Sequence, residues 1–177
     1  MSTINIEDSV VLIIDIQEKL VNAAYNKDEV IKNSQIISKA AKILDIPTIA
    51  TEQYPKGLGN TIEGIESCKT FEKISFSALD SEEISSNIKN TGKKQVILMG
   101  IETHICVNQT ASALIKNGYE VYVIQNACSS RAESEHLAGL DRMKSFGAEI
   151  LTAEIAVFEW LKTAKHPKFK EVQALIK

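Results

Sequence analysis

Three side chains in this sequence of 177 residues have the types and positions that thiol chemistry requires. Asp15 directly follows the apolar run VVLII, Lys73 opens the short segment KISF, and Cys106 lies behind the apolar run VILMG. A cysteine becomes a nucleophile when a neighbouring base takes its proton or when a cation stabilises the thiolate. The carboxylate and the ammonium could therefore prepare the sulfur for attack on a carbonyl group.

Each of these residues alone also has an ordinary structural explanation. An Asp after a strand often caps the next helix, a Lys at a strand edge often extends to solvent, and free Cys is among the most buried residue types. Cys128 is a rival nucleophile at another strand end, and Cys68 is a weaker rival in an irregular segment. Only the order Asp, Lys, Cys at three strand ends favours chemistry over packing.

The segments that must position these residues alternate between short apolar runs and longer amphipathic stretches. Six strands are expected, at residues 10–17, 46–51, 73–76, 95–100, 120–125 and 148–153. Apolar residues at helical spacing fill most of the intervals between them. The alternation predicts an α/β protein with a three-layer αβα, Rossmann-like fold, in which helices cover both faces of a six-stranded parallel sheet. We expect residues 1–177 to form one domain.

The turn that carries the cysteine is expected to begin a helix. A helix that starts near Thr103 or His104 would place Cys106 in its first turn, where backbone N–H groups and the helix dipole favour a thiolate. His104 itself is expected to face solvent. Further upstream, Ser77 followed by Asp80 resembles a capping box at the start of a helix.

Residues 51–72 interrupt the alternation, because Pro and Gly break any periodic pattern there. We expect a loop with one turn of helix at residues 62–67. Ligands of open α/β sheets bind outside the carboxyl ends of the strands, and this segment starts at one such end. It is therefore predicted to form a wall of a pocket.

Composition and charge exclude several classes of partner. Apolar residues make up 44% of the sequence, which suffices for a substantial core, and the net charge is -3 with Lys and Arg dispersed among Asp and Glu. The sequence has no basic stripe, so a nucleic-acid partner is not expected. It also has no apolar run of the kind that forms a membrane span or a signal peptide. Three cysteines in unrelated contexts fit free thiols in the cytoplasm. The three histidines lack the spacing of metal ligands, so no metal or other cofactor is expected.

Several motifs in order resemble the isochorismatase-like cysteine hydrolases, whose triad is Asp, Lys and Cys in that chain order. The segments LIIDIQEKL, FEKISFSAL and LMGIETHICVNQTA match the family's three triad motifs, and the likeness covers nearly the whole chain. The segments TEQYPKGLGNT and HPKFKEVQALIK look most like the isochorismatase domain-containing proteins, which lack a settled substrate. Nicotinamidases of the same superfamily carry an Asp-x-His metal motif, which is absent here.

The resemblance implies a chemistry and a set of site residues. Asp15, Lys73 and Cys106 would hydrolyse a small amide-like substrate through a thioester. The backbone N–H groups of Glu102 and Cys106 would form an oxyanion hole, with a cis peptide joining Ile101 to Glu102. The resemblance also implies a homo-oligomer, a dimer or larger. The expected lining of the substrate pocket is Gln17, Tyr54, Phe76, Ile101 and Thr103.

Two alternatives stay open at this point. Family members that cleave the vinyl ether of isochorismate use the Asp as an acid and do not need the cysteine, so Cys106 favours C–N hydrolysis. A protein of another class would be catalytically idle and would work through oligomer contacts or a bound partner. The intact triad argues against that alternative, because an idle site has no physical reason to keep a lysine beside a desolvated Asp.

Overall fold

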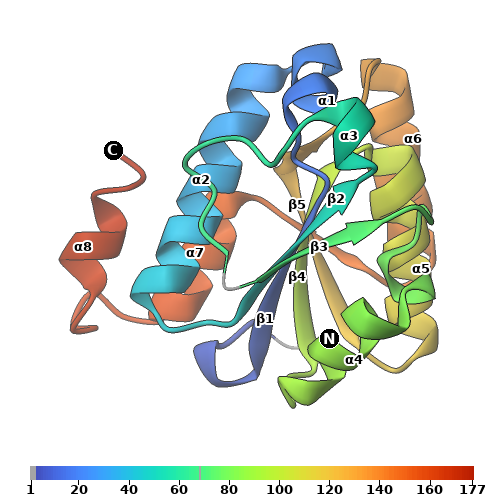
Figure 1. Ribbon diagram of the computed structural model, residues 1–177. Coiled ribbons are helices and arrows are strands. Elements are labelled where there is room, and N and C mark those ends of the chain that lie inside the picture. Colours follow the sequence, from blue (N-terminus) through green and yellow to red (C-terminus); the bar gives the residue numbers. More distant parts are fainter. Residues whose placement is uncertain (1–2, 68) are drawn as a thin grey trace.

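Parallel strands form the centre of the molecule, described here by a computed structural model of residues 3–67 and 69–177 (Figure 1). Within these residues, six strands pair in the order β3-β2-β1-β4-β5-β6, and every pair is parallel. The predicted α/β fold with a six-stranded parallel sheet is confirmed. The strands are β1 (Ser9–Ile14), β2 (Thr48–Gln53), β3 (Lys69–Lys73), β4 (Gln95–Ile101), β5 (Glu120–Ser129) and β6 (Glu149–Leu151).

Helices cover both faces of this sheet (Figure 1). On one side, α2 (Lys27–Ile43) packs against α1 (Glu18–Ala23), α7 (Ala153–Leu161) and α8 (Phe169–Gln173). On the other side, α5 (Asn108–Lys116) packs against α6 (Glu133–Ser145), with α4 (Glu82–Asn90) nearby. The remaining short elements are η1 (Ile6–Asp8), α3 (Pro55–Leu58), η2 (Ala78–Asp80) and the π-helical turn η3 (Thr103–Val107). None of the helices in the described residues combines the length and the apolar character needed to cross a membrane.

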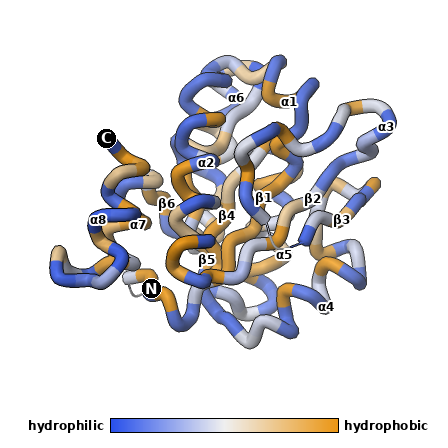
Figure 2. The backbone as a smooth tube through the Cα atoms, turned by 60° about the vertical axis from the view of Figure 1, so that its left-hand side comes forward, coloured by the Kyte–Doolittle hydropathy of each residue, from blue (hydrophilic) through white to orange (hydrophobic). Residues whose placement is uncertain are grey.

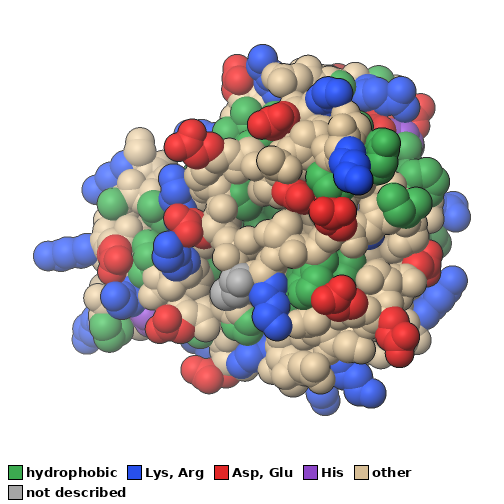
Figure 3. Space-filling model, in the orientation of Figure 1, with side chains coloured by type: hydrophobic (Ala, Val, Ile, Leu, Met, Phe, Trp, Pro, Cys, Tyr) green, Lys and Arg blue, Asp and Glu red, His purple; other side chains and the backbone are tan. Residues whose placement is uncertain are grey.

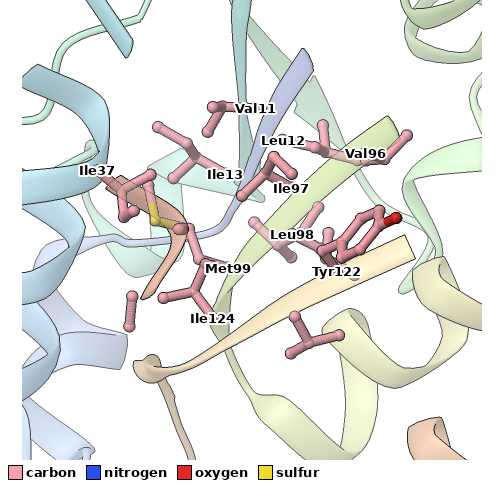
Figure 4. Close-up of a cluster of buried hydrophobic side chains, with 14 of the residues drawn as sticks. Val11, Leu12, Ile13, Ile37, Val96, Ile97, Leu98, Met99, Tyr122 and Ile124 are labelled. Carbon is pink, nitrogen blue, oxygen red and sulfur yellow. The ribbon is translucent and has the colours of Figure 1, made fainter. Parts of the chain in front are cut away.

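The hydrophobic core lies along the central strands. Every residue of β1 and β4 is buried, because helices cover both faces of these two strands. Figure 2 shows the hydrophobic colour gathered on the central strands, and Figure 4 shows Met99 of β4 close to Ile37 of α2. On the face shown in Figure 3, by contrast, positive and negative side chains are intermixed.

Two predicted segments near the site are wrong. The strand expected at residues 73–76 lies earlier, so that Lys73 closes β3 instead of opening a strand. The reason is the pairing with β2, which sets Gln53 opposite Lys73, after which the chain bends through residues 74–77. The helical turn expected at residues 62–67 is instead α3, because Pro55 occupies a first-turn position, where its fixed φ suits a helix start.

Two further predictions need correction. The fifth strand runs beyond residue 125 to Ser129, and a register shift between β4 and β5 sets Cys128 opposite Gly100. Cys128 thus lies inside a strand and not at its end. The expected capping box is also wrong, because Ser77 caps η2 and a second serine, Ser81, caps α4.

Gly100 allows β4 to approach the end of β1 closely. It pairs with Ile14 and has φ +140°, a conformation that side chains rarely adopt. A Cβ atom at this position would lie 2.0 Å from the carbonyl oxygen of Ile14. The residue that follows Ile14 is Asp15, whose φ of 50° turns the chain out of β1. Gly100 therefore sets the backbone position from which the Asp15 side chain extends.

We expect Gly100→Ala to destabilise the protein by about 3 kcal/mol or more, because overpacking against backbone adds to an unfavourable φ. Gly118→Ala is the matched control, since Gly118 also has a positive φ but open space around it. That control should cost only about 1–2 kcal/mol. Urea unfolding monitored by circular dichroism measures both values. Equal losses in the two variants would contradict this account of Gly100.

Candidate active site

A buried ion pair joins the first and third strands. Nζ of Lys73 lies 2.6 Å from Oδ2 of Asp15, and both side chains are 0% exposed. The hydroxyl of Thr51, on the intervening strand β2, donates to Oδ1 of Asp15 at 2.7 Å. One carboxylate oxygen therefore faces a cation and the other faces a hydroxyl, which fixes the orientation of the carboxylate.

The ammonium of Lys73 has a protein acceptor for each of its three N–H bonds. Besides Asp15, it donates to Oε1 of Gln53 at 2.7 Å and to the carbonyl of Ser75 at 3.2 Å. An ammonium carries three donors and no acceptor. Gln53 was missed by the sequence analysis. Its signal is the β2–β3 register, which sets it opposite Lys73 and which no local pattern reveals.

Cys106 lies in the π-helical turn η3 and is 7% exposed. Burial, followed by the negative charge of Asp15, raises the pKa of its thiol to about 12, although the Lys73 charge and a hydrogen bond from the Glu102 backbone lower it. Burial and the Asp15 charge thus oppose the thiolate that a position in a first helical turn favours. The thiol is protonated at neutral pH, and its hydrogen-bond partner is the Asp15 carboxylate.

The turn before Cys106 differs from a regular α-helix. The carbonyl of Glu102 accepts from the N–H groups of Ile105 and Val107, at 3.1 and 3.2 Å. A regular helix would use the N–H of Cys106 instead, because the bond joins residues four apart. The wider turn thus directs these two bonds past the Cys106 N–H. The peptide from Ile101 to Glu102 is cis, as the family resemblance implied.

The Glu102 side chain is tied to the loop that follows β5. Its Oε2 accepts from the backbone N–H of Arg131 at 3.2 Å and from Nε of Arg131 at 3.0 Å. The carboxylate is thus paired with Arg131, and the backbone of Glu102 is what hydrogen-bonds to the Cys106 sulfur.

Gln17, which was expected to line the pocket, is buried and bonds to the backbone of neighbouring segments. Its side chain is fully buried; its Nε2 donates to the carbonyls of Gln53 and Gly59, and its Oε1 accepts from the N–H of Gln53. The amide therefore pairs with the backbone of Gln53 as a neighbouring strand would, beyond the point where β1 ends.

The other expected pocket residues separate into two groups. Ile101 and Thr103 are buried, and the Thr103 hydroxyl hydrogen-bonds to Nδ1 of His136 at 2.8 Å. Tyr54 and Phe76 are more than half exposed. Tyr54 borders an open hollow of about 490 Å³ that also touches Lys73, Ile74 and Ser75. The first group therefore belongs to the interior, and the second belongs to the surface.

The rival residues occupy other environments. Cys128 is fully buried, and burial raises the pKa of its thiol to about 12. Cys68 lies outside the described residues. His104 does not extend freely into solvent as expected, because its Nδ1 hydrogen-bonds to the Ser130 hydroxyl at 3.0 Å. Within residues 3–67 and 69–177, no group of three His, Cys, Asp or Glu side chains could hold a metal ion.

Comparison with known proteins decides the family. The model of the isochorismatase domain matches residues 9–155. The chain belongs to the isochorismatase family. Isochorismatase domain-containing protein 2 of Danio rerio is 40% identical over 171 residues, which cover 95% of this chain and 86% of that protein.

Solved structures agree with this family and fold. The structure of MAR1 ribonuclease from Caenorhabditis elegans is 38% identical, with a TM-score of 0.92 over 99% of this chain and 92% of that one. The YcaC gene product of Escherichia coli, described as an octameric hydrolase of unknown specificity, has a TM-score of 0.89. At 23% identity over 99% of this chain and 95% of that one, YcaC shows the fold alone.

In this isochorismatase-family hydrolase, Lys73→Met should leave the buried Asp15 carboxylate without a positively charged partner. We expect it to lower the free energy of unfolding by about 3–5 kcal/mol at neutral pH, as for other broken buried ion pairs. The double variant Asp15→Asn, Lys73→Met should lose less than the single variant, since it leaves no buried charge. Urea unfolding measures both. A double variant that loses as much as the sum of the two single substitutions would contradict the coupling.

Proposed function

We propose that this isochorismatase-family hydrolase cleaves the C–N bond of a small amide-like substrate through a thioester on Cys106. One observation carries the proposal. The Asp15 carboxylate is ion-paired with the Lys73 ammonium and is a hydrogen-bond partner of the Cys106 thiol, so a proton acceptor and a positive charge both act on the sulfur. This is the arrangement in which a base activates a cysteine by taking its proton.

The first step is attack by sulfur on the carbonyl carbon. Because burial keeps the thiol protonated at rest, a thiolate has to be formed during the reaction. Asp15 takes the proton as the S–C bond forms, and the electron pair of the C=O bond moves to oxygen. A resting thiol beside a resting carboxylate fits general base catalysis better than a preformed thiolate does.

Two backbone N–H groups can receive the charge on that oxygen. The Glu102 N–H is directed at the sulfur. In the π-helical turn the Glu102 carbonyl accepts from Ile105 and Val107 and not from the N–H of Cys106. Donors fixed in this way stabilise an oxyanion without having to reorganise. Glu102 and Cys106 are therefore proposed as the oxyanion hole.

Asp15 then acts as an acid. It returns its proton to the leaving nitrogen as the C–N bond breaks, and an amine or ammonia departs. A water molecule that gives its proton to the same carboxylate attacks the thioester. The C–S bond then breaks to release a carboxylic acid, the electron pair leaves with the sulfur, and Asp15 returns its proton to the sulfur. Through both steps the Lys73 charge balances a negative charge that moves from Asp15 to the sulfur and the oxyanion. The buried site is thus never left with an unpaired charge.

Two other functions are outcomes of the test. Vinyl ether hydrolysis would use Asp15 as an acid and would leave Cys106 without a role. RNA cleavage is suggested by the name of the Caenorhabditis elegans neighbour and would likewise need no thioester. The contact between Asp15 and the Cys106 thiol favours the amide substrate over both. We also predict that the protein is a homo-oligomer in the cytoplasm. Its partner is predicted to be a small molecule and not nucleic acid.

We expect a panel of small amides to yield an acyl adduct on Cys106 in rapidly quenched samples analysed by peptide mass spectrometry. Cys106→Ala should yield no adduct and no turnover, because it removes the attacking atom. Asp15→Asn should slow the reaction by about a hundredfold or more, since it removes the base. Cys128→Ala, the matched control, should keep both adduct and turnover.

Other results of the same screen would redirect the assignment. Pyruvate released from isochorismate at equal rates by the wild type and Cys106→Ala would establish the vinyl ether reaction instead. RNA cleaved at equal rates by both would establish a nuclease. Turnover of any amide by Cys106→Ala at the wild-type rate would refute the thioester scheme.

A further inference from the structure

The Lys73 ammonium acts on the Cys106 sulfur through its charge but has no N–H left for a substrate. Its three donors are used by Asp15, Gln53 and the carbonyl of Ser75. A lysine with a spare donor would be an anchor for a carboxylate on the substrate, because charge-assisted hydrogen bonds are the strong ones. Gln53 supplies the acceptor that removes this possibility, at 2.7 Å.

Gln53 is held in this position from several directions. Its Nε2 donates to the carbonyl of Ile74 at 2.6 Å, which leaves its Oε1 to accept from Lys73. The orientation of the amide is thereby defined, because the carbonyl can only accept and the ammonium can only donate. The backbone of Gln53 is fixed in turn by the buried amide of Gln17, on both its N–H and its carbonyl. The Gln53 amide therefore cannot turn away from Lys73 without also losing its bond to Ile74, and its backbone is anchored separately.

We propose that Gln53 is a positioning residue that occupies the last N–H of Lys73 and so restricts the site to substrates with an uncharged acyl group. The inference rests on the proposed function and deepens it. Lys73 then serves only to balance the charge on Asp15 and sulfur. The acyl part of the substrate is bound by backbone N–H groups, and a carboxylate near the scissile bond finds no cation with a donor to spare.

The test uses two alkylating reagents of nearly equal size, neutral iodoacetamide and anionic iodoacetate. With either one the sulfur of Cys106 forms a bond to the methylene carbon, the C–I bond breaks and iodide leaves with the electron pair. The thiol proton passes to Asp15 and then to solvent. Peptide mass spectrometry gives the rate at Cys106 for each reagent. The ratio of the two rates is divided by the same ratio for glutathione, which removes the intrinsic difference between the reagents.

Three variants separate a specific role of Gln53 from a general one. Gln53→Met keeps the length of the side chain but frees one N–H of Lys73, so the iodoacetate to iodoacetamide ratio should rise about tenfold, the value of one charge-assisted hydrogen bond. Gln53→Glu keeps the acceptor and adds a negative charge, so the ratio should fall below that of the wild type. Gln35→Met, at a partly buried position of α2 where the side chain bonds to the carbonyl of Glu63, should leave the ratio unchanged.

The order expected for the ratio is therefore Gln53→Glu, wild type, Gln53→Met, from lowest to highest. Equal ratios in all of these proteins would overturn the inference, even if both reagents react more slowly, because slower reaction with both is what a merely structural role produces. A wild-type Cys106 that reacts with neither reagent in the folded protein would instead overturn the proposed nucleophile, and the inference with it. Circular dichroism of each variant verifies that the comparison is made between folded proteins.

Discussion

The ion pair between Asp15 and Lys73 is the interaction on which the site depends. Two opposite charges without contact to solvent are costly to bury, and such a pair persists only when hydrogen bonds satisfy the remaining atoms. Here Thr51 completes the carboxylate, while Gln53 and Ser75 complete the ammonium. The result is a carboxylate that is held in a fixed position as the hydrogen-bond partner of a thiol.

The strand order explains how distant segments reach this pair. β1, β2 and β3 are neighbours in the sheet, so their carboxyl ends bring Asp15, Thr51 and Lys73 to one edge. β4 lies on the other side of β1, and the turn after it presents Cys106 to the same carboxylate. Gly100 allows the close approach of these two strands. The chemistry therefore requires three crossovers and one glycine, and no cofactor enters the proposed scheme.

The sequence predicts the fold class from the alternation of apolar runs with amphipathic stretches. The order Asp, Lys, Cys along the chain, together with the resemblance to a family, predicts the three site residues, because none of them is decisive alone. Gln53 escapes prediction, since its role arises from the β2–β3 register and not from local pattern. The π-helical turn could not be predicted either, because the spacing of apolar residues does not distinguish a π-helical turn from an α-helical one. The raised pKa of the Cys106 thiol could not be predicted from the sequence. A position in the first turn of a helix favours a thiolate, but burial and the Asp15 charge raise the pKa.

The central claim is that the sulfur rests as a thiol and that Asp15 is its proton acceptor. The most direct measurement is the ultraviolet absorbance of the thiolate, taken as the difference between the wild type and Cys106→Ala from about pH 6 to about pH 9, where an unperturbed thiol would titrate. A raised pKa keeps the proton on sulfur throughout this range, so the account predicts a flat difference. A step with its midpoint near neutral pH would show a preformed thiolate and contradict the account.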